Sequence, residues 1–561
     1  MIDTVVIIVF SLLILLVGIS FSRTGRNLKS FFAGGASVPW FIGGLSLFMS
    51  FFSAGTFVAW GAIAYQYGWV AITIQWTMCI GALIAGFFLA PRWKATGNLT
   101  AAGFIKARLG NKVQKSFVYI FMLVSVFIKG SVLYAVAKLV SVSLGYQLIP
   151  VTIILGILMI SYAAVGGLWA VMVTDILQFA VLTAAVLIIL PLVFGEVGGL
   201  HGFVSRVPDG FFDLVHGEYT WGFIFAFAIY HIFYIGGNWT FVQRYTSVAT
   251  PKSASKVAFL FAALYVLSPV LWMLPPMAYK IINPALAGIS AENAYIMVCK
   301  QVLPSGLMGL MLTGMYFSTS ASANTALNVV SAVFTNDVYK GSINPHASNG
   351  KLMFVARASS WFFGLLMILI ALVVPHIGGI VEFTLSLGAI TGGPLLLPPI
   401  WALFSRRLSG KATIGITVVS LAINLLFKIV VPVVNGYKLS RANEMLLGVL
   451  FPLILLCIQE TIMWWKKQTS VDYVNYISYR ASEKNTPLKA LDDAELEMIK
   501  KQNVFGLKMI SFSLAFMALL LYILAAITVK SSLLVAIIAT FILVVSYVPF
   551  AIAKKRTRLN E

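Results

Sequence analysis

Charged side chains are scarce in this chain of 561 residues. Asp, Glu, Lys and Arg together make up 10% of it, whereas hydrophobic residues make up 60% and the mean hydropathy is +0.95. A soluble globular domain carries roughly 25% charged residues. The shortage therefore excludes a soluble protein and indicates one that crosses a membrane many times.

Cysteine and histidine are scarce as well. The three cysteines lie in or beside separate apolar runs, so we expect neither a disulfide framework nor a metal cluster. The five histidines show no metal-ligand spacing, and no pairing of a nucleophile with a base is evident. We therefore expect that the chain is not an enzyme.

Apolar runs of about 20 residues recur along the chain, and each is long enough for an α-helix to cross a hydrocarbon core of about 30 Å. The first run follows Asp3, an acid where a signal peptide carries Lys or Arg, so we expect this helix to be retained. We count about fifteen runs. They predict a lead helix with the first cytoplasmic loop (1–29), a ten-helix core (30–410), two accessory helices (411–465), a cytoplasmic loop with a short amphipathic helix (466–504) and two C-terminal helices with a basic tail (505–561).

The net charge of +21 would suggest nucleic acid as a partner in a soluble protein, but here the placement of the charges matters more. Lys and Arg gather in alternate loops, and the basic tail at 554–558 belongs to the same set. We expect the protein to lie in a cell (inner) membrane. By the positive-inside rule its N-terminus lies outside and its C-terminus lies in the cytoplasm. Within 466–504, Thr486 and Pro487 favour the start of a short surface helix.

Two apolar runs carry residues that interrupt helices. The first run of the ten-helix core contains "SAGT" (53–56), and the sixth contains "IYHIFYIGGNWTFVQR" with Gly236 and Gly237. Interrupted helices in corresponding positions of two five-helix halves are typical of inverted repeats with a binding site at mid-membrane. A break would free backbone N–H groups to face an anion. The alternative is close helix packing through small residues.

Charges within apolar runs are costly and require a partner. Asp175 in the fifth core helix and Lys129 in the third are of this kind. In the eighth core helix Ser318, Ser322 and Thr325 have the spacing i, i+4 and i+7, which gives one hydroxyl stripe. Such a stripe either supports interhelical hydrogen bonds or supplies oxygen ligands to a small alkali cation.

Several longer segments resemble the sodium:solute symporter family. Residues 145–170, "GYQLIPVTIILGILMISYAAVGGLWA", are similar to its signature, and "SFFAGGASVPWFIGGLSLF", "TDILQ" and "FTNDVYK" are similar to its first, fifth and eighth core-helix motifs. The resemblance covers about residues 30–411. It implies an all-α fold of the LeuT type, a 5+5 inverted repeat with one lead helix and about four extra C-terminal helices. It also implies a symporter that takes up a small solute with sodium ion, and we expect a monomer in the lipid bilayer with no nucleic-acid partner.

The resemblance also implies sodium ligands. The family's common site takes the backbone carbonyls of Met49, Phe52, Ser318 and Ala321 and the hydroxyl of Ser322. A second site in some members matches Asp175 and Thr325, whereas Asn324 replaces a hydroxyl residue there and so departs from the pattern.

The substrate residues resemble one branch of the family more than another. Sugar cotransporters place Asn, His, Glu and Gln where this chain has Phe51, Thr56, Gln75 and Leu385, and only their Tyr is kept, as Tyr234. The sialic acid transporters match at Ser53, Thr56, Gln75 and Lys129, and we expect these four residues, together with Phe51 and Tyr234, to contact the substrate. We therefore predict a sodium-coupled importer of a small carboxylate-bearing solute, with sialic acid as the first candidate. The alternatives are a neutral sugar symporter and, from another class, a transporter-like membrane sensor.

Overall fold

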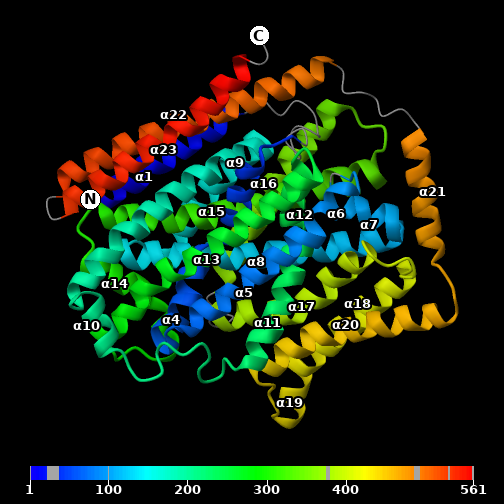
Figure 1. Cartoon of the computed structure of the whole chain (residues 1–561), viewed down its shortest axis with the longest axis horizontal. Helices are drawn as coiled ribbons and strands as arrows, with labels where there is room; N and C mark the ends of the chain where they lie inside the picture. Colours follow the sequence, from blue (N-terminus) through cyan, green and yellow to red (C-terminus); the bar gives the residue numbers. More distant parts are fainter. Residues whose placement is uncertain are drawn as a thin grey trace.

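The structure is a computed structural model that describes residues 2–21, 37–98, 100–374, 380–485, 493–528 and 531–558. Helices dominate these residues, which contain no β-strand beyond two isolated bridges (Figure 1). In chain order they are α1 (Ile2–Ser20), α3 (Trp40–Phe51), η2 (Thr56–Trp60), α4 (Gly61–Tyr67), α5 (Val70–Ile84), η3 (Ala85–Leu89), α6 (Ala90–Ala95), α7 (Ala101–Leu109), α8 (Asn111–Leu144), α9 (Leu148–Glu196), α10 (Gly199–Arg206), α11 (Trp221–Gly237), α12 (Trp239–Ser247), α13 (Pro251–Ile282), η4 (Gly288–Asn293), α14 (Ala294–Val302), α15 (Leu307–Val333), η5 (Phe334–Ile343), α16 (Asn349–Val373), α17 (Ile380–Ala402), α18 (Gly410–Leu425), η7 (Leu426–Val430), α19 (Val431–Asn435), α20 (Arg441–Trp465), α21 (Val471–Asn485), α22 (Asp493–Ile527) and α23 (Ser532–Arg558).

The long apolar runs form the expected helices. Among the described residues, eleven helical segments are long and apolar enough to cross a membrane, and the bent pair Trp40–Phe51 and Thr56–Tyr67 brings the number to twelve. The shorter apolar helices Leu148–Ser161 and Trp221–Gly237 and the more polar α15 correspond to the other three of the fifteen expected runs. The fold is therefore an all-α membrane bundle.

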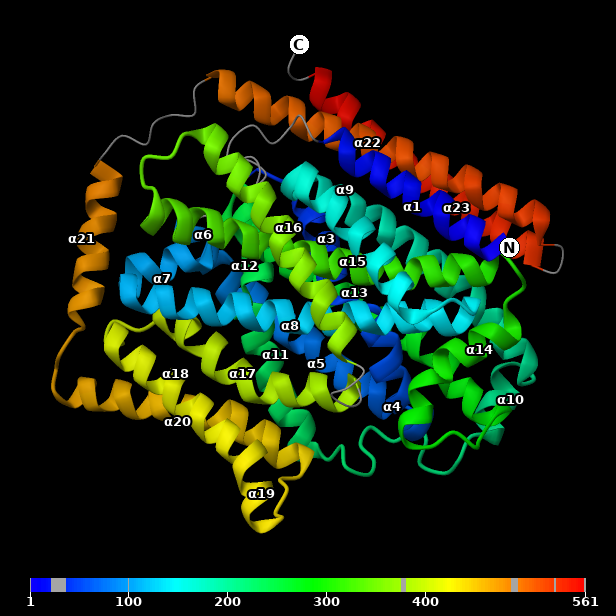
Figure 2. The same ribbon diagram turned by 180° about the vertical axis from the view of Figure 1, so that it is seen from behind.

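The lead helix belongs to an outer layer. Figures 1 and 2 show α1 beside α22 and α23 along one edge of the bundle. Asp3 fixes α1 to the core, because its Oδ1 atom accepts hydrogen bonds from the Gly306 and Gly309 amides at the start of α15, at 2.6 and 2.7 Å. These amides have no partner within the helix, so a carboxylate there stabilises α15.

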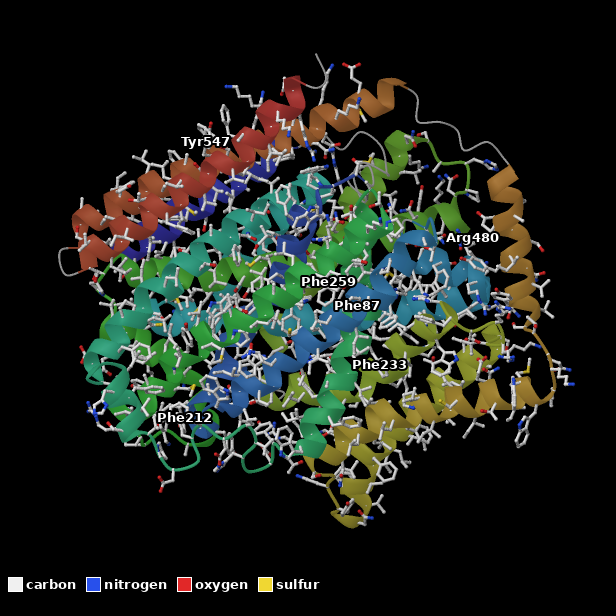
Figure 3. The ribbon with its side chains drawn as sticks, viewed as in Figure 1. Phe87, Phe212, Phe233, Phe259, Arg480 and Tyr547 are labelled. Carbon is white, nitrogen blue, oxygen red and sulfur yellow. The ribbon has the colours of Figure 1, made fainter. Side chains whose placement is uncertain are left out.

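A second outer element, α21, runs along the flank of the bundle beside α7 (Figure 1). Arg480, labelled in Figure 3, donates from Nη2 to the Ala95 carbonyl at 2.9 Å. The ring of Tyr476 lies 6.0 Å from the Phe104 ring. Part of the expected cytoplasmic loop is thus a helix docked on the core. Thr486 and Pro487 lie outside the described residues, and α22 begins at Asp493 and continues without interruption to Ile527.

Both interrupted helices are broken. The two parts of the first core helix are bent by 63° between Phe51 and Thr56. In the sixth, the break falls at Asn238, whose backbone is extended and whose Oδ1 atom caps α12 by accepting from the Thr240 amide at 3.0 Å.

The two glycines before that break have a different role from the expected one. A Cβ at Gly237 would lie 2.9 Å from the Leu396 carbonyl oxygen of α17, and one at Gly236 would lie 2.1 Å from the Leu89 side chain. These glycines therefore permit close helix packing, while Asn238 makes the break.

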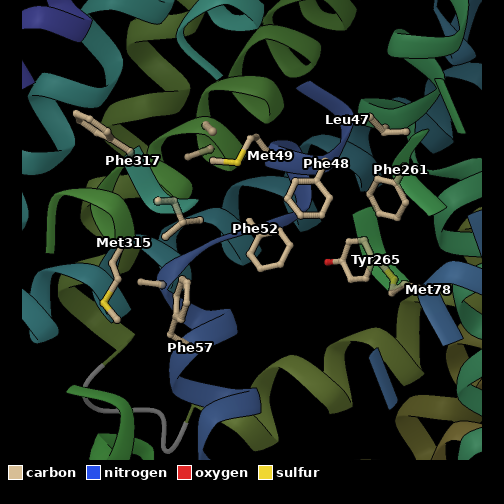
Figure 4. Close-up of a cluster of buried hydrophobic side chains, with 14 of the residues drawn as sticks. Leu47, Phe48, Met49, Phe52, Phe57, Met78, Phe261, Tyr265, Met315 and Phe317 are labelled. Carbon is tan, nitrogen blue, oxygen red and sulfur yellow. The ribbon is translucent and has the colours of Figure 1, made fainter. Parts of the chain in front are cut away.

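Aromatic side chains pack behind the break in α3 (Figure 4). The Phe52 ring lies 4.8 Å from the Phe48 ring and meets the Trp272 ring edge-on at 3.7 Å, and Tyr265 of α13 lies within 6 Å of both phenylalanines. A comparable contact between Phe87 and Phe259, at 4.8 Å, joins η3 to α13 (Figure 3). The cluster around Phe52 holds the end of α3 against α13 and so fixes the position of the break.

Candidate functional site

The backbone at the α3 break is satisfied by hydroxyl groups. The Ser53 amide donates to Thr56 Oγ1 at 3.3 Å, and the Ala54 amide donates to Thr319 Oγ1 at 2.8 Å. In an uninterrupted helix these amides would bond to carbonyls four residues earlier. Our expectation that they are free to face an anion is therefore wrong for Ser53 and Ala54, because Thr56 and Thr319 occupy them. The bond to Thr319 instead joins the break to α15.

A cavity of about 110 Å³ opens beside this break. It brings together five of the six side chains predicted to contact substrate, contributed by α3, the break, η2, α8 and α11. They are Phe51, Ser53, Thr56, Lys129 and Tyr234.

Gln75, the sixth of these predicted residues, is not among the described residues that line this cavity. It is buried in α5, and its Nε2 atom faces the Ala71 carbonyl one turn earlier at 3.4 Å. Gln75 thus belongs to the packing of α5 in this conformation.

A larger cavity of about 160 Å³ adjoins the first, and the two share Phe51, Trp60 and Tyr234 in their walls. It extends along α8 toward the end where α7 lies, and its walls are largely apolar, with many aromatic residues among them. Its further aromatic residues, which the sequence did not single out as ligands, are Phe117, Phe121, Phe227, Tyr230, His231 and Trp239. Three of these lie within "IYHIFYIGGNW", so the broken sixth helix was itself a signal for them.

The predicted ligands of the common sodium site lie on two helices that contact each other, α3 and α15. Met49 and Phe52 are buried at the end of α3, and Ser318, Ala321 and Ser322 are buried on α15. The Ser318 hydroxyl donates to the Met315 carbonyl of its own helix at 2.8 Å. The Ser322 hydroxyl instead accepts a hydrogen bond from Lys129 Nζ at 2.6 Å.

Two of the three residues predicted for a second sodium site, Asp175 and Thr325, contact an arginine. Arg244, from the end of the broken sixth helix, donates from Nη2 to Thr325 Oγ1 at 2.8 Å, and the same nitrogen lies 3.7 Å from Asp175 Oδ2. Its Nε atom donates to Ser46 Oγ at 2.9 Å, and Ser46 in turn donates to Asp175. Asn324 is not part of this group, since its Nδ2 atom faces Ser320 at 3.2 Å.

This arrangement supplies the partner that Asp175 requires. Both Asp175 and Arg244 are fully buried, and a buried carboxylate is tolerated when a cation and hydrogen bonds compensate for lost hydration. A sodium ion at the same place would lie against the guanidinium. Sequence reasoning missed Arg244 because an arginine at a helix end usually reaches toward the membrane surface.

Comparison with known proteins identifies the family. The sequence profile of the sodium:solute symporter family matches residues 31–418. The sodium/glucose cotransporter of Vibrio parahaemolyticus is 26% identical to this chain, and the match covers 73% of this chain and 81% of that protein. Sodium/glucose cotransporter 1 of Mus musculus is also 26% identical, over 72% of this chain and 68% of that protein.

Solved structures show the same fold. A substrate-bound, outward-open Na⁺-coupled sialic acid symporter matches with a TM-score of 0.72 at 21% identity, over 82% of this chain and 98% of that one. Mhp1, a nucleobase-cation-symport-1 family transporter, matches with a TM-score of 0.55 at 14% identity, over 80% and 98% of the two chains. The chain therefore belongs to the sodium:solute symporter family and is a multi-pass membrane transporter of the LeuT type rather than an enzyme.

Proposed function

We propose that this symporter imports a small organic carboxylate together with sodium, and that sialic acid is the first compound to test. The observation that carries this proposal is the position of Lys129, whose side chain lines the same cavity as the hydroxyl-bearing residues Ser53 and Thr56. No acidic side chain is among the described residues that line either cavity. Among these described residues Lys129 is thus the one charged side chain, and a cation with neutral donors beside it is the chemistry that binds a carboxylate.

The energetic cost of Lys129 supports the same proposal. A lysine at mid-membrane costs about 2.5–3.5 kcal/mol on insertion scales, and such residues usually mark a substrate or ion pathway. A bound carboxylate would offset part of this cost, because a hydrogen bond to a charged group contributes about 1.5–3 kcal/mol.

The aromatic residues that line the larger cavity indicate what the rest of the substrate is like. Phe51, Trp60 and Tyr234 lie between the polar end, with Lys129, and the wider space lined by α11 and α17. Rings of this kind contact the apolar faces of a ligand, while Tyr and Trp keep a hydrogen-bonding group at the edge. A carboxylate with a bulky body of several carbon atoms fits this arrangement better than acetate does.

A neutral sugar is the second candidate, and the match to glucose cotransporters favours it. Tyr234 is common to the two hypotheses, because it is the one sugar-site residue that this chain keeps. Lys129 distinguishes them, since a neutral sugar gives its charge no counterion.

The positions of the basic residues support the proposed orientation of the protein. Arg92, Lys94, Lys106 and Lys554 belong to α6, α7 and the end of α23, whereas α1 begins at the opposite end of the bundle (Figure 1). By the positive-inside rule the C-terminus is cytoplasmic and the N-terminus is outside, in a cell (inner) membrane. Sodium entry then drives uptake with about 2.3 kcal/mol per 100 mV, and a tenfold concentration ratio adds about 1.4 kcal/mol. We expect a monomer to suffice, because one chain supplies the whole cavity.

The experiment is a transport screen with purified protein in liposomes. Labelled sialic acid, smaller and more apolar carboxylates, and neutral sugars are offered under an inward sodium gradient and under a matched potassium gradient. We expect sodium-dependent accumulation of a carboxylate and none of the sugars. Sodium-dependent uptake of a sugar alone would reject the carboxylate, and equal uptake under both gradients would reject sodium coupling.

A further inference from the structure

The contact between Lys129 and Ser322 joins the two parts of the site. Lys129 Nζ donates to Ser322 Oγ at 2.6 Å, and both side chains line the cavity of about 110 Å³. Among the described residues, no carboxylate lies within ion-pair distance of Lys129. The ammonium group thus rests on a neutral hydroxyl, and no acidic partner among those residues holds it there.

Ser322 has a special place among the predicted sodium ligands. The other four ligands, at Met49, Phe52, Ser318 and Ala321, are backbone carbonyls, so Ser322 supplies the one side-chain oxygen of the set. A sodium ion coordinated by this oxygen would lie next to the ammonium nitrogen that now bonds to it. Two positive charges at contact distance in a membrane interior repel each other strongly. Sodium and the Lys129 ammonium therefore cannot share Ser322.

We propose that Lys129 is a tethered cation that competes with sodium for Ser322, and that sodium binding moves its ammonium group away from Ser322 and into the cavity of about 110 Å³ that both side chains line, where it meets the substrate. This inference rests on the proposed function and adds its coupling step. The movement needs only side-chain rotation, because lysine has a flexible four-carbon stem and Lys129 already lines the cavity with Ser53 and Thr56.

The exchange links the two ligands thermodynamically. Without an anion in the cavity, sodium binding leaves the displaced ammonium unpaired, so sodium binds weakly. With a carboxylate present the displaced ammonium gains a partner, and each ligand strengthens the binding of the other by the same factor. An empty transporter would therefore rarely carry sodium alone across the membrane.

The test measures sodium binding to the purified full-length protein with no organic substrate. Sodium chloride is titrated against choline chloride at constant ionic strength, and binding is followed by tryptophan fluorescence, for which Trp60 in the cavity wall is a suitable reporter. Lys129→Met removes the competing charge. We expect it to lower the sodium dissociation constant at least tenfold, which corresponds to about 1.4 kcal/mol.

The matched control is Lys138→Met. Lys138 lies on the same helix and is also half-buried, but it lines neither cavity. Its Nζ atom instead lies 6.0 Å from the Tyr134 ring centre. Its replacement should leave the sodium dissociation constant unchanged. If Lys129→Met does not give a folded, monodisperse protein, Lys129→Gln is measured instead. That variant keeps a donor for Ser322 without the charge, so it should also bind sodium more tightly than wild type.

Sodium binding that is unchanged or weaker in the folded Lys129 variant would overturn the exchange. So would an equal gain in Lys138→Met, because the effect would then be general electrostatics. These results are separate from failure of the proposed function, which would appear as absence of sodium-dependent uptake in the wild type.

Discussion

Arg244 lies against Asp175 in the interior of the bundle, with its Nη2 atom 3.7 Å from Asp175 Oδ2, and Ser46 is hydrogen-bonded to both side chains. The pair joins the fifth core helix to the broken sixth one, and the Ser46 hydroxyl attaches it to the first. Arg244 also bonds to Thr325 of α15. A protein cation thus contacts two of the three residues that the resemblance assigned to a second sodium ion.

Removing one charge of this pair should destabilise the fold. Asp175→Asn leaves Arg244 buried without a counterion, and breaking a buried pair in this way costs about 3–5 kcal/mol. Thermal unfolding in detergent should show a large decrease in Tm. The double variant Asp175→Asn/Arg244→Gln is neutral at both positions and should recover part of that loss. A double variant as unstable as the single one would argue against the pair.

The same replacement should not change ion stoichiometry. Because Arg244 already neutralises Asp175, we expect Asp175→Asn to slow uptake at a constant ratio of sodium to substrate. Reversal potentials measured on liposomes that contain the variant give this ratio. A ratio that falls by one sodium would mean that Asp175 holds a transported ion.

The common sodium site can be tested with two serines of one helix. Ser322→Ala deletes a predicted side-chain ligand and should raise the sodium concentration for half-maximal uptake several-fold, in line with the loss of about 1 kcal/mol or more. Ser318→Ala is the control, since the Ser318 hydroxyl already donates to the Met315 carbonyl and only its backbone carbonyl is a predicted ligand. Sodium dependence that shifts equally in both variants would indicate a general effect of packing in α15.

Asp337, which lies outside the membrane-spanning segments, should make the stability of the protein depend on pH. Burial raises the pKa of its carboxyl to about 7, although Lys106 and a hydrogen bond from Gln114 at 2.6 Å oppose the shift. The folded protein therefore retains a proton that the unfolded chain, with an ordinary pKa near 3.8, has lost between about pH 4 and pH 7. Since the folded state binds more protons in this window, Asp337 lowers stability as the pH rises through it.

The variant Asp337→Asn removes this titration. Its Tm relative to wild type should rise as the pH increases from 4 to 7 and then level off. Asp213→Asn, in an exposed loop, is the control and should show no such trend. A constant difference between Asp337→Asn and wild type across this range would contradict the account.

Much of the architecture could be predicted from the chain because apolar length and interruption are local properties. The run lengths predicted the helices, and "SAGT" predicted the break after Phe51. The second break was placed slightly too early, at Gly236 and Gly237. The sequence does not distinguish a glycine that ends a helix from one that allows another helix to pack closely. The Leu396 carbonyl that packs against Gly237 comes from a distant part of the chain, so only the fold reveals it.

The site was harder to predict where it depends on partners distant in the chain. Asp175 clearly required a partner, but Arg244 lies 69 residues away and its charge alone does not say which helix it faces. Lys129 was expected at the substrate, and the structure adds its bond to Ser322. Gln75 was predicted by resemblance alone. The direction of its side chain depends on how α5 is rotated about its own axis, and the apolar sequence of α5 does not determine this rotation.

Recognition of a carboxylate by Lys129, as we propose, is tested most directly by comparing an acid with its methyl ester as competitors of sodium-driven uptake. Wild type should prefer the acid, and Lys129→Met should lose most of this preference, because a charge-assisted bond contributes roughly 1.5–3 kcal/mol, or about ten- to more than a hundredfold in affinity. Thr56→Val, which deletes a neutral hydroxyl, should cost only about 1 kcal/mol and keep the preference. Equal loss of acid and ester binding in Lys129→Met would contradict the claim, as would a wild type that binds both alike.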